Sequence, residues 1–133
     1  MRNKKAMFTS EYQNWKTPKA FFQALDAEFS FDFDPCPPNP DFDGLNVSWG
    51  KSNFVNPPYN ELSKWLSRGY KEHQMGNKVV FLIPSRTDTK WWHEIVMKAD
   101  EIRFIKGRLT FEGAKSNAPF PSCVVVFLGE EAA

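Results

Sequence analysis

Two uninterrupted apolar segments constrain the fold of this 133-residue chain more than any other feature. They run from Val79 to Ile83 and from Cys123 to Leu128. A strand with one face in water alternates apolar and polar residues, whereas a strand covered on both faces is apolar throughout. Both segments therefore predict strands that lie in a sheet buried on both sides.

Helical and strand patterns alternate over most of the remaining chain. Thr17 and Pro18 predict a helix start, with Thr17 as the N-cap and Pro18 at the first helical position. Further helices are predicted over about 61–73 and about 89–99. Strands are predicted over residues 31–34, 53–55, 79–83, 102–105, 109–111 and 123–128. This order indicates an α/β fold with a mainly parallel sheet and an antiparallel edge.

The length fits a single domain, which we expect over residues 15–133 after a polar arm of residues 1–14. No apolar segment reaches the length of a membrane span, and the first residues lack the apolar centre of a signal peptide. Cys36 and Cys123 form no metal-binding pattern. The expectation is therefore a cytoplasmic protein with reduced thiols and without a bound metal.

The distribution of charge is more informative than the net charge of +1. Residues 64–115 contain eleven Lys or Arg against six Asp or Glu, whereas residues 1–63 contain six against eight. A mildly basic second half can meet phosphates, and an acidic first half can meet a cation. Ordinary solvated charge explains this asymmetry equally well, so charge alone assigns no partner.

Unusual residues follow three of the predicted strands. In sheets of this class, ligands bind beyond the carboxyl ends of the strands. The chain places Asp34-Pro35-Cys36 after the first strand, Asn56-Pro57-Pro58-Tyr59 after the second and Pro84-Ser85-Arg86 after the third. These three segments are therefore the first candidates for a functional site.

Asn56-Pro57-Pro58-Tyr59 carries the clearest chemical signal. The side-chain oxygen of Asn56 is a hydrogen-bond acceptor, and the two prolines stiffen the turn so that the Pro57 carbonyl can point into a cleft. Each oxygen can accept one N–H of an amine, which leaves the nitrogen lone pair free to meet an electrophilic methyl group. The ring of Tyr59 can stack on a planar base. Positioning is the main requirement, because a sulfonium methyl donor is already reactive. A plain Pro-Pro turn is the structural alternative.

The tetrapeptide resembles the (Asn/Asp)-Pro-Pro-(Tyr/Phe/Trp) motif of amino-methyltransferases that act on adenine, cytosine or glutamine amides. From about residue 15 onward, the chain resembles the phage-type DNA adenine methyltransferase family. The matches, in order, are Trp15 to Pro18 with Phe21 and Leu25, Phe31 to Cys36, Asp43 to Leu45, Trp49, Phe54 to Tyr59, Trp65, Leu82 to Pro84, Thr87 to Trp92, Gly107 to Leu109, Phe111, and Pro119 to Phe127.

This resemblance implies transfer of a methyl group from S-adenosylmethionine to the exocyclic amino group of a flipped-out adenine in DNA. It also implies a reduced Rossmann-like methyltransferase fold. The catalytic residues that it implies are Asn56, Pro57, Pro58 and Tyr59. The cofactor-binding residues that it implies are Thr17, Pro18, Asp34, Pro35 and Cys36.

The chain departs from the usual methyltransferase pattern in two ways. The loop after Asp34 is rich in proline and has no glycine before Gly44. The missing G-x-G-x-x-G pattern also argues against a nicotinamide enzyme. Only about twenty residues separate Asp34 from Asn56, so the usual two strand–helix units between them do not fit. We therefore expect a smaller sheet and an altered adenosine pocket.

An adenine inside a duplex must be flipped out before this chemistry can reach it. Arg86 follows a strand that is predicted to be buried, and Arg108 lies in the turn after Lys106 and Gly107. With Lys90, these two arginines are the candidates for contact with DNA phosphates. Each cation could equally be ordinary surface charge.

Other functions remain open at this stage. A protein glutamine or RNA adenine methyltransferase would use the same amine grip. A degenerate module could bind DNA without turnover, and a plain structural α/β domain is a third alternative. The resemblance implies a phage or prophage protein in the cytoplasm of a bacterial host. We expect a monomer or a homodimer that has DNA as its partner.

Overall fold

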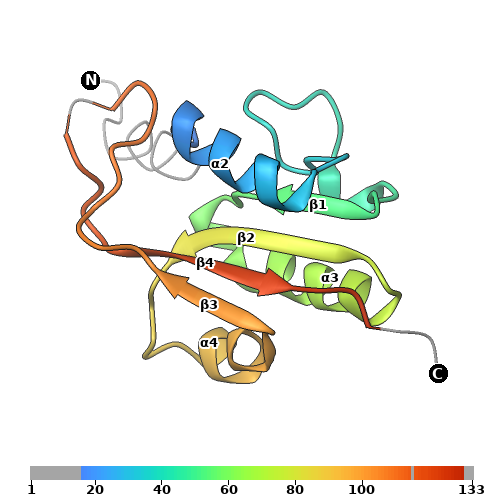
Figure 1. The fold of residues 1–133 in the computed structure, drawn as a ribbon. Helices are drawn as coiled ribbons and strands as arrows, with labels where there is room; N and C mark the ends of the chain where they lie inside the picture. Colours follow the sequence, from blue (N-terminus) through green and yellow to red (C-terminus); the bar gives the residue numbers. More distant parts are fainter. Residues whose placement is uncertain (1–15, 115, 131–133) are drawn as a thin grey trace, which may run out of the picture.

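The structure, a computed structural model, describes residues 16–114 and 116–130. Four strands form one sheet in the order β1-β2-β4-β3 (Figure 1). Trp15 and the polar arm predicted for residues 1–14 lie outside the described residues. The strands are β1 (Ser52–Val55), β2 (Lys78–Pro84), β3 (Glu101–Phe104) and β4 (Ser122–Phe127).

The sheet is mixed. β1 and β2 pair in parallel, whereas β4 lies antiparallel between β2 and β3. The predicted α/β class is confirmed, but the position of the reversed strand was wrong, because β4 lies inside the sheet and not at its edge. Because the reversed strand has a neighbour on each side, two of the three pairings are antiparallel, and the prediction of a mainly parallel sheet was also wrong. Since every residue of β4 is buried, a central place keeps the whole strand away from water.

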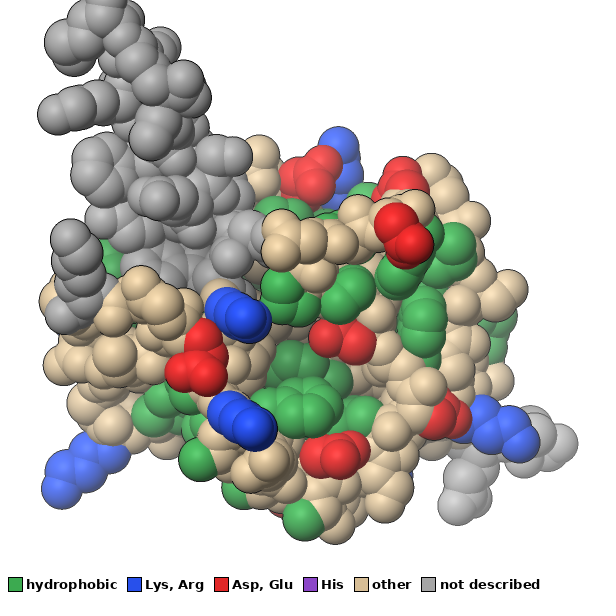
Figure 2. Space-filling model, turned by 90° about the horizontal axis from the view of Figure 1, so that it is seen from above, with side chains coloured by type: hydrophobic (Ala, Val, Ile, Leu, Met, Phe, Trp, Pro, Cys, Tyr) green, Lys and Arg blue, Asp and Glu red, His purple; other side chains and the backbone are tan. Residues whose placement is uncertain are grey.

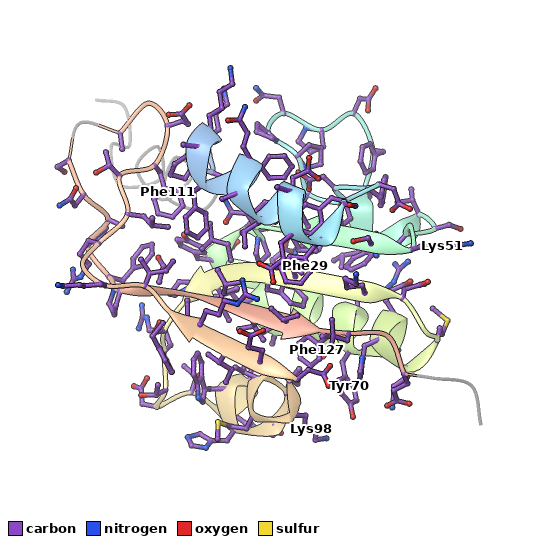
Figure 3. All side chains as sticks on the ribbon, in the orientation of Figure 1. Phe29, Lys51, Tyr70, Lys98, Phe111 and Phe127 are labelled. Carbon is purple, nitrogen blue, oxygen red and sulfur yellow. The ribbon has the colours of Figure 1, made fainter. Side chains whose placement is uncertain are left out.

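Helices cover both faces of this sheet (Figure 1). The helix α2 (Lys19–Phe29) lies on one face, and α3 (Leu62–Gln74) and α4 (Lys90–Glu94) lie on the other. Figure 3 shows Phe29 on the α2 side of the sheet and Phe127 on the α3 side. Among the described residues, no helix is long and apolar enough to cross a membrane.

The alternation of side chains along β2 explains its continuous apolar sequence. Val79, Phe81 and Ile83 point into the core that α3 and α4 cover. Val80 and Leu82 point into the core that α2 covers. Successive side chains of a strand face opposite sides, so a strand between two layers needs apolar residues at every position. The prediction from the apolar run is confirmed.

Two predicted strands and one predicted helix differ from the structure. Residues 31–34 contribute one bridge, between Phe33 and Asn53, because Pro35 has no N–H with which to extend the ladder. Residues 109–111 form no strand and pack over the α2 face. Residues 89–99 divide into α4 and a 3-10 turn, since Ile95 leaves the helical conformation with φ −120°.

The connections at one edge of the sheet position the functional site. β1, β2 and β3 end at this edge and β4 begins there, as the register of their pairing requires. Asn56, Arg86 and the long connection between β3 and β4 therefore leave the sheet on the same side. In Figure 1 this edge lies at the left, where the long connection rises toward α2.

Candidate active site

A pocket of about 350 Å³ lies beside the carboxyl end of β1. It brings together four of the predicted site residues, which come from three separate segments. Figure 2, which looks onto the α2 side, shows a hollow where hydrophobic side chains lie between basic and acidic ones. The lining residues are Lys16, Thr17, Lys19, Phe22, Asp34, Cys36, Pro38, Phe54, Asn56 and Glu112.

Asn56 follows β1 directly, and only 7% of its surface is exposed. Its Nδ2 donates a hydrogen bond to Thr17 Oγ1 at 3.0 Å. The prediction that Thr17 caps the first helix was wrong, because Pro18 occupies the N-cap position and no side chain caps the helix. The hydroxyl of Thr17 contacts Asn56 instead.

The two prolines of the tetrapeptide use their carbonyl groups differently. The Pro58 carbonyl accepts a hydrogen bond from Glu61 N at 3.1 Å and so begins a 3-10 turn that leads into α3. Among the described residues, no group donates a hydrogen bond to the carbonyl of the buried Pro57. This carbonyl is available to a ligand, as the amine grip requires.

Tyr59 is half-buried and does not line the pocket itself. Its ring meets the ring of Phe120 edge to face, with centroids 5.0 Å apart. Burial raises the pKa of Tyr59 well above its ordinary range, so the hydroxyl stays protonated. Phe120 belongs to the connection between β3 and β4, and sequence reasoning gave it no role. The sequence feature that could have indicated Phe120 is its place between two prolines, Pro119 and Pro121.

Asp34 is the acidic group of the pocket. Burial raises its pKa to about 6, against an ordinary value of 3.8, although its Oδ1 accepts a hydrogen bond from Cys36 N at 2.9 Å. Burial also raises the pKa of the Cys36 thiol to about 12, and the negative charges of Asp34 and Glu61 act in the same direction. Cys36 is therefore a protonated wall of the pocket and not a nucleophile at neutral pH.

The proline-rich loop after Asp34 is held firmly without a glycine-rich turn. A Cβ atom at Gly44 would lie 1.8 Å from the Pro35 carbonyl oxygen, so only glycine allows the loop to fold back there. Trp49 Nε1 donates to the Gly44 carbonyl at 2.7 Å. Arg68, on α3, donates to the carbonyls of residues 45 and 47 at 2.7 and 2.6 Å. Sequence reasoning missed Arg68, which has no local signal.

The three predicted DNA contacts lie outside the pocket. Arg86 is exposed just after β2, and its carbonyl accepts hydrogen bonds from Thr89. Lys90 is exposed at the start of α4, with its Nζ 3.9 Å from Glu94. Arg108 is exposed and donates to the Ala118 carbonyl at 3.4 Å. Arg86 follows β2 and Arg108 follows β3, so both residues leave the sheet at the edge where Asn56 follows β1.

Pro18 and Pro35 lie next to the pocket and do not line it. Lys16 and Lys19 do line it, and their signal in the sequence is that they flank Thr17 and Pro18. The Lys16 carbonyl accepts a hydrogen bond from Glu112 N at 2.9 Å, so the long connection between β3 and β4 closes one side of the pocket. Within residues 16–114 and 116–130, no cluster of His, Cys, Asp or Glu has the form of a metal site.

Comparison with known proteins gives the context of this site. The sequence profile described as DNA N-6-adenine-methyltransferase (Dam) matches residues 4–130. A DNA N-6-adenine-methyltransferase of Escherichia phage T1 is 31% identical over 64 residues, which are 47% of this chain and 27% of that relative. No solved structure matches the chain. The profile covers all the pocket residues and nearly the whole sequence, and the chain therefore belongs to the DNA N-6-adenine-methyltransferase (Dam) family.

Proposed function

We propose that this protein is an S-adenosylmethionine-dependent methyltransferase that acts on the exocyclic amino group of a flipped-out adenine in DNA. Family membership supports the reaction, and the described pocket supports its location. One observation carries the proposal: Asn56, a buried amide at the carboxyl end of β1, lines the same pocket as Asp34. An acceptor for an amine and an acidic group for a cationic donor thus share one cavity.

The pocket residues fit S-adenosylmethionine. A volume of about 350 Å³ lies within the usual range for small-ligand sites. Phe22 and Phe54 offer apolar surface, and the half-buried Asp34 has no cationic partner among its described hydrogen bonds and ion pairs. A positively charged ligand would restore the ionised form of Asp34. Lys16 and Lys19 stand where they could meet a carboxylate.

The target amine would be held by oxygen atoms of the tetrapeptide. The Asn56 amide oxygen and the Pro57 carbonyl would each accept one N–H, so that the nitrogen lone pair faces the methyl donor. Tyr59 would stack on the adenine ring, with Phe120 beside it at the edge. Tyr59 is the last residue of the tetrapeptide, and Phe120 comes from the long connection between β3 and β4.

S-adenosylmethionine, when bound, supplies a methyl group on a positively charged sulfur, and the transfer leaves a neutral thioether. The chain's own residues orient the amine, exclude water and stabilise the positive charge that develops on its nitrogen. The amine gains the carbon–nitrogen bond and releases one proton to solvent. No side chain has to act as a strong base, which agrees with the protonated state of Tyr59 and Cys36.

DNA would approach along the edge of the sheet. Arg86 and Arg108 are exposed there and would contact phosphates on either side of the flipped nucleotide. Lys90 would add a weaker contact, because Glu94 already lies within 3.9 Å of its ammonium group. The cofactor side and the DNA side of the pocket are then formed by different segments, with Asn56 between them.

A substrate panel tests the proposal. Labelled S-adenosylmethionine is incubated with unmethylated DNA, RNA and a protein that carries an accessible glutamine. We expect label in DNA, and a loss of at least 100-fold in rate when Asn56 is replaced by alanine. Asn46→Ala is a matched control, since Asn46 is exposed and does not line the pocket. Label in RNA or protein alone would change the substrate class. Binding of the donor with no transfer to any substrate would favour a degenerate DNA-binding module.

A further inference from the structure

We infer that Thr17 is a positioning residue for Asn56: its hydroxyl holds the amide in the orientation that grips the target amine. The inference rests on the proposed function, because it concerns the same reaction. It differs from the sequence prediction, in which Thr17 capped a helix and bound the cofactor. The positioning role follows from one contact and from the way in which Thr17 itself is held.

The contact joins residues that are 39 positions apart in the sequence. Asn56 Nδ2 donates to Thr17 Oγ1 at 3.0 Å, and both side chains line the pocket. The nitrogen and the oxygen of an amide lie on opposite branches of the same carbon atom. When the nitrogen is bound to Thr17, the oxygen must therefore point away from Thr17.

The opposite orientation would not support the reaction. If the amide turned by half a rotation, Asn56 would present its NH2 group to an amine, and two donors would face each other. The two orientations have nearly the same shape. A threonine hydroxyl can accept a hydrogen bond from the amide nitrogen or donate one to the amide oxygen, and the structure shows the first arrangement, in which Asn56 Nδ2 is the donor. Because Asn56 is only 7% exposed, water is a poor substitute for the Thr17 hydroxyl.

Thr17 is held in place from both sides. The carbonyl of Lys16 accepts a hydrogen bond from Glu112 N at 2.9 Å, and that of Pro18 accepts one from Phe22 N at 3.0 Å. The helix α2 nevertheless begins without a side-chain cap. A threonine hydroxyl at a helix start usually caps the first turn, which stabilises the helix. Here the Thr17 hydroxyl accepts a hydrogen bond from Asn56, although Thr17 is only one residue before the N-cap position.

Two substitutions test the inference in the full chain. Thr17→Val keeps the shape of the side chain and removes the acceptor, whereas Thr17→Ser keeps the hydroxyl. We expect Thr17→Val to lower kcat by roughly 10-fold, which is the worth of one hydrogen bond. The Kd for S-adenosylmethionine, measured by calorimetry, should stay within about threefold of wild type. Thr17→Ser should restore kcat to within about threefold.

A second measurement does not depend on turnover. Hydrogen exchange of the Asn56 side-chain amide, followed by NMR, should be roughly 10-fold faster in Thr17→Val and close to wild type in Thr17→Ser. Equal exchange in all three proteins would overturn the inference. So would a Thr17→Val enzyme with an unchanged kcat, or one that loses cofactor affinity as strongly as it loses rate.

The outcomes separate this inference from the proposed function. If the wild type transfers no methyl group to any substrate, the proposed function fails, whatever Thr17→Val does. If the wild type is active and Thr17→Val matches it in kcat, only the positioning role fails. A Thr17→Ser variant as slow as Thr17→Val would also overturn the role, because the hydroxyl would then not be the group that acts.

Discussion

Phe33 and Asn53 form a single parallel bridge, and this pairing sets the distance between the two halves of the pocket. Phe54 N donates to the Phe33 carbonyl at 3.1 Å, so Asp34, the next residue, lies beside the last residues of β1. Asp34 and Asn56 then line one cavity, although residues 34–51 contain no strand that pairs with β1. Residues 31–34 therefore position Asp34 through one bridge to β1, without forming the predicted strand.

The buried side chain of Asn53 connects β1 to the turn before it and to the start of β2. Its Nδ2 donates to the carbonyls of Gly50 and Lys78, and its Oδ1 accepts from Gly50 N. Asn53→Ala would leave these buried groups without partners and should lower the free energy of unfolding by about 2–4 kcal/mol. Urea unfolding measures this change. Asn46→Ala, at an exposed position, should cost less than about 0.5 kcal/mol; an equal cost in both variants would refute the role of Asn53.

Asp34 should make cofactor binding depend on pH. Its pKa of about 6 means that the free protein carries a proton on this group below pH 6. A cationic ligand needs the ionised form, so the Kd for S-adenosylmethionine should rise about 10-fold between pH 7 and pH 5. Asp34→Asn should bind the ligand weakly and without this pH dependence. A wild-type Kd that is constant over this range would contradict the assignment.

The same group should reduce stability at neutral pH. The pKa of Asp34 is higher in the folded protein than in the unfolded chain, so the folded state is favoured at low pH and this advantage is lost as pH rises through 6. Asp34→Asn removes the buried charge and should be more stable than wild type at pH 7.5, by about 2–3 kcal/mol. At pH 4 the two proteins should differ little. Unfolding curves at both pH values check the sign.

Gly44 should be intolerant of any side chain. Its missing Cβ would lie 1.8 Å from the Pro35 carbonyl oxygen and 2.8 Å from the Trp65 ring. Gly44→Ala should therefore displace the loop, lower stability by about 2–4 kcal/mol and weaken cofactor binding. Gly113→Ala is the matched control for steric overlap, because no atom lies within 4 Å of the position that a Cβ would take at Gly113. Its positive φ of 80° should cost only about 1 kcal/mol.

Arg86 and Arg108 should contribute charge to DNA binding. Replacement of either by alanine should weaken binding and reduce the slope of log Kd against log salt concentration by about 1. Lys51→Ala removes the same charge at the opposite end of the sheet and should leave the slope unchanged (Figure 3). Binding curves at several salt concentrations give the slopes. Equal slopes for all the variants would place the DNA elsewhere.

The strands and α3 could be predicted from the sequence because their signals are local. β2 and β4 are apolar at every position, and α3 carries its apolar residues at helical spacing. The order of the sheet could not be read in this way. A continuous apolar sequence fits an edge strand as well as a central one in this fold, since the edge strand β1 is buried at every position, as the central strand β4 is.

Individual residues of the site could be predicted from the sequence, but the contacts between them could not. Asn56 was indicated by its place after the strand β1, and Asp34 by its place at the end of the predicted strand 31–34, which forms only one bridge; the structure places both residues on one pocket. The hydrogen bond from Asn56 to Thr17 and the contact of Tyr59 with Phe120 each join distant segments. The Gly44 approach to Pro35 also depends on how the loop folds back. Such contacts arise from tertiary packing, which periodicity and propensity do not contain.

The most direct measurement is nucleoside mass spectrometry of DNA incubated with the protein and S-adenosylmethionine. We expect N6-methyladenine with the wild type, and none above background with Asn56→Ala at equal thermal stability. Methylated cytosine, or equal amounts of N6-methyladenine with both proteins, would contradict the central claim that Asn56 presents the adenine amine to the methyl donor.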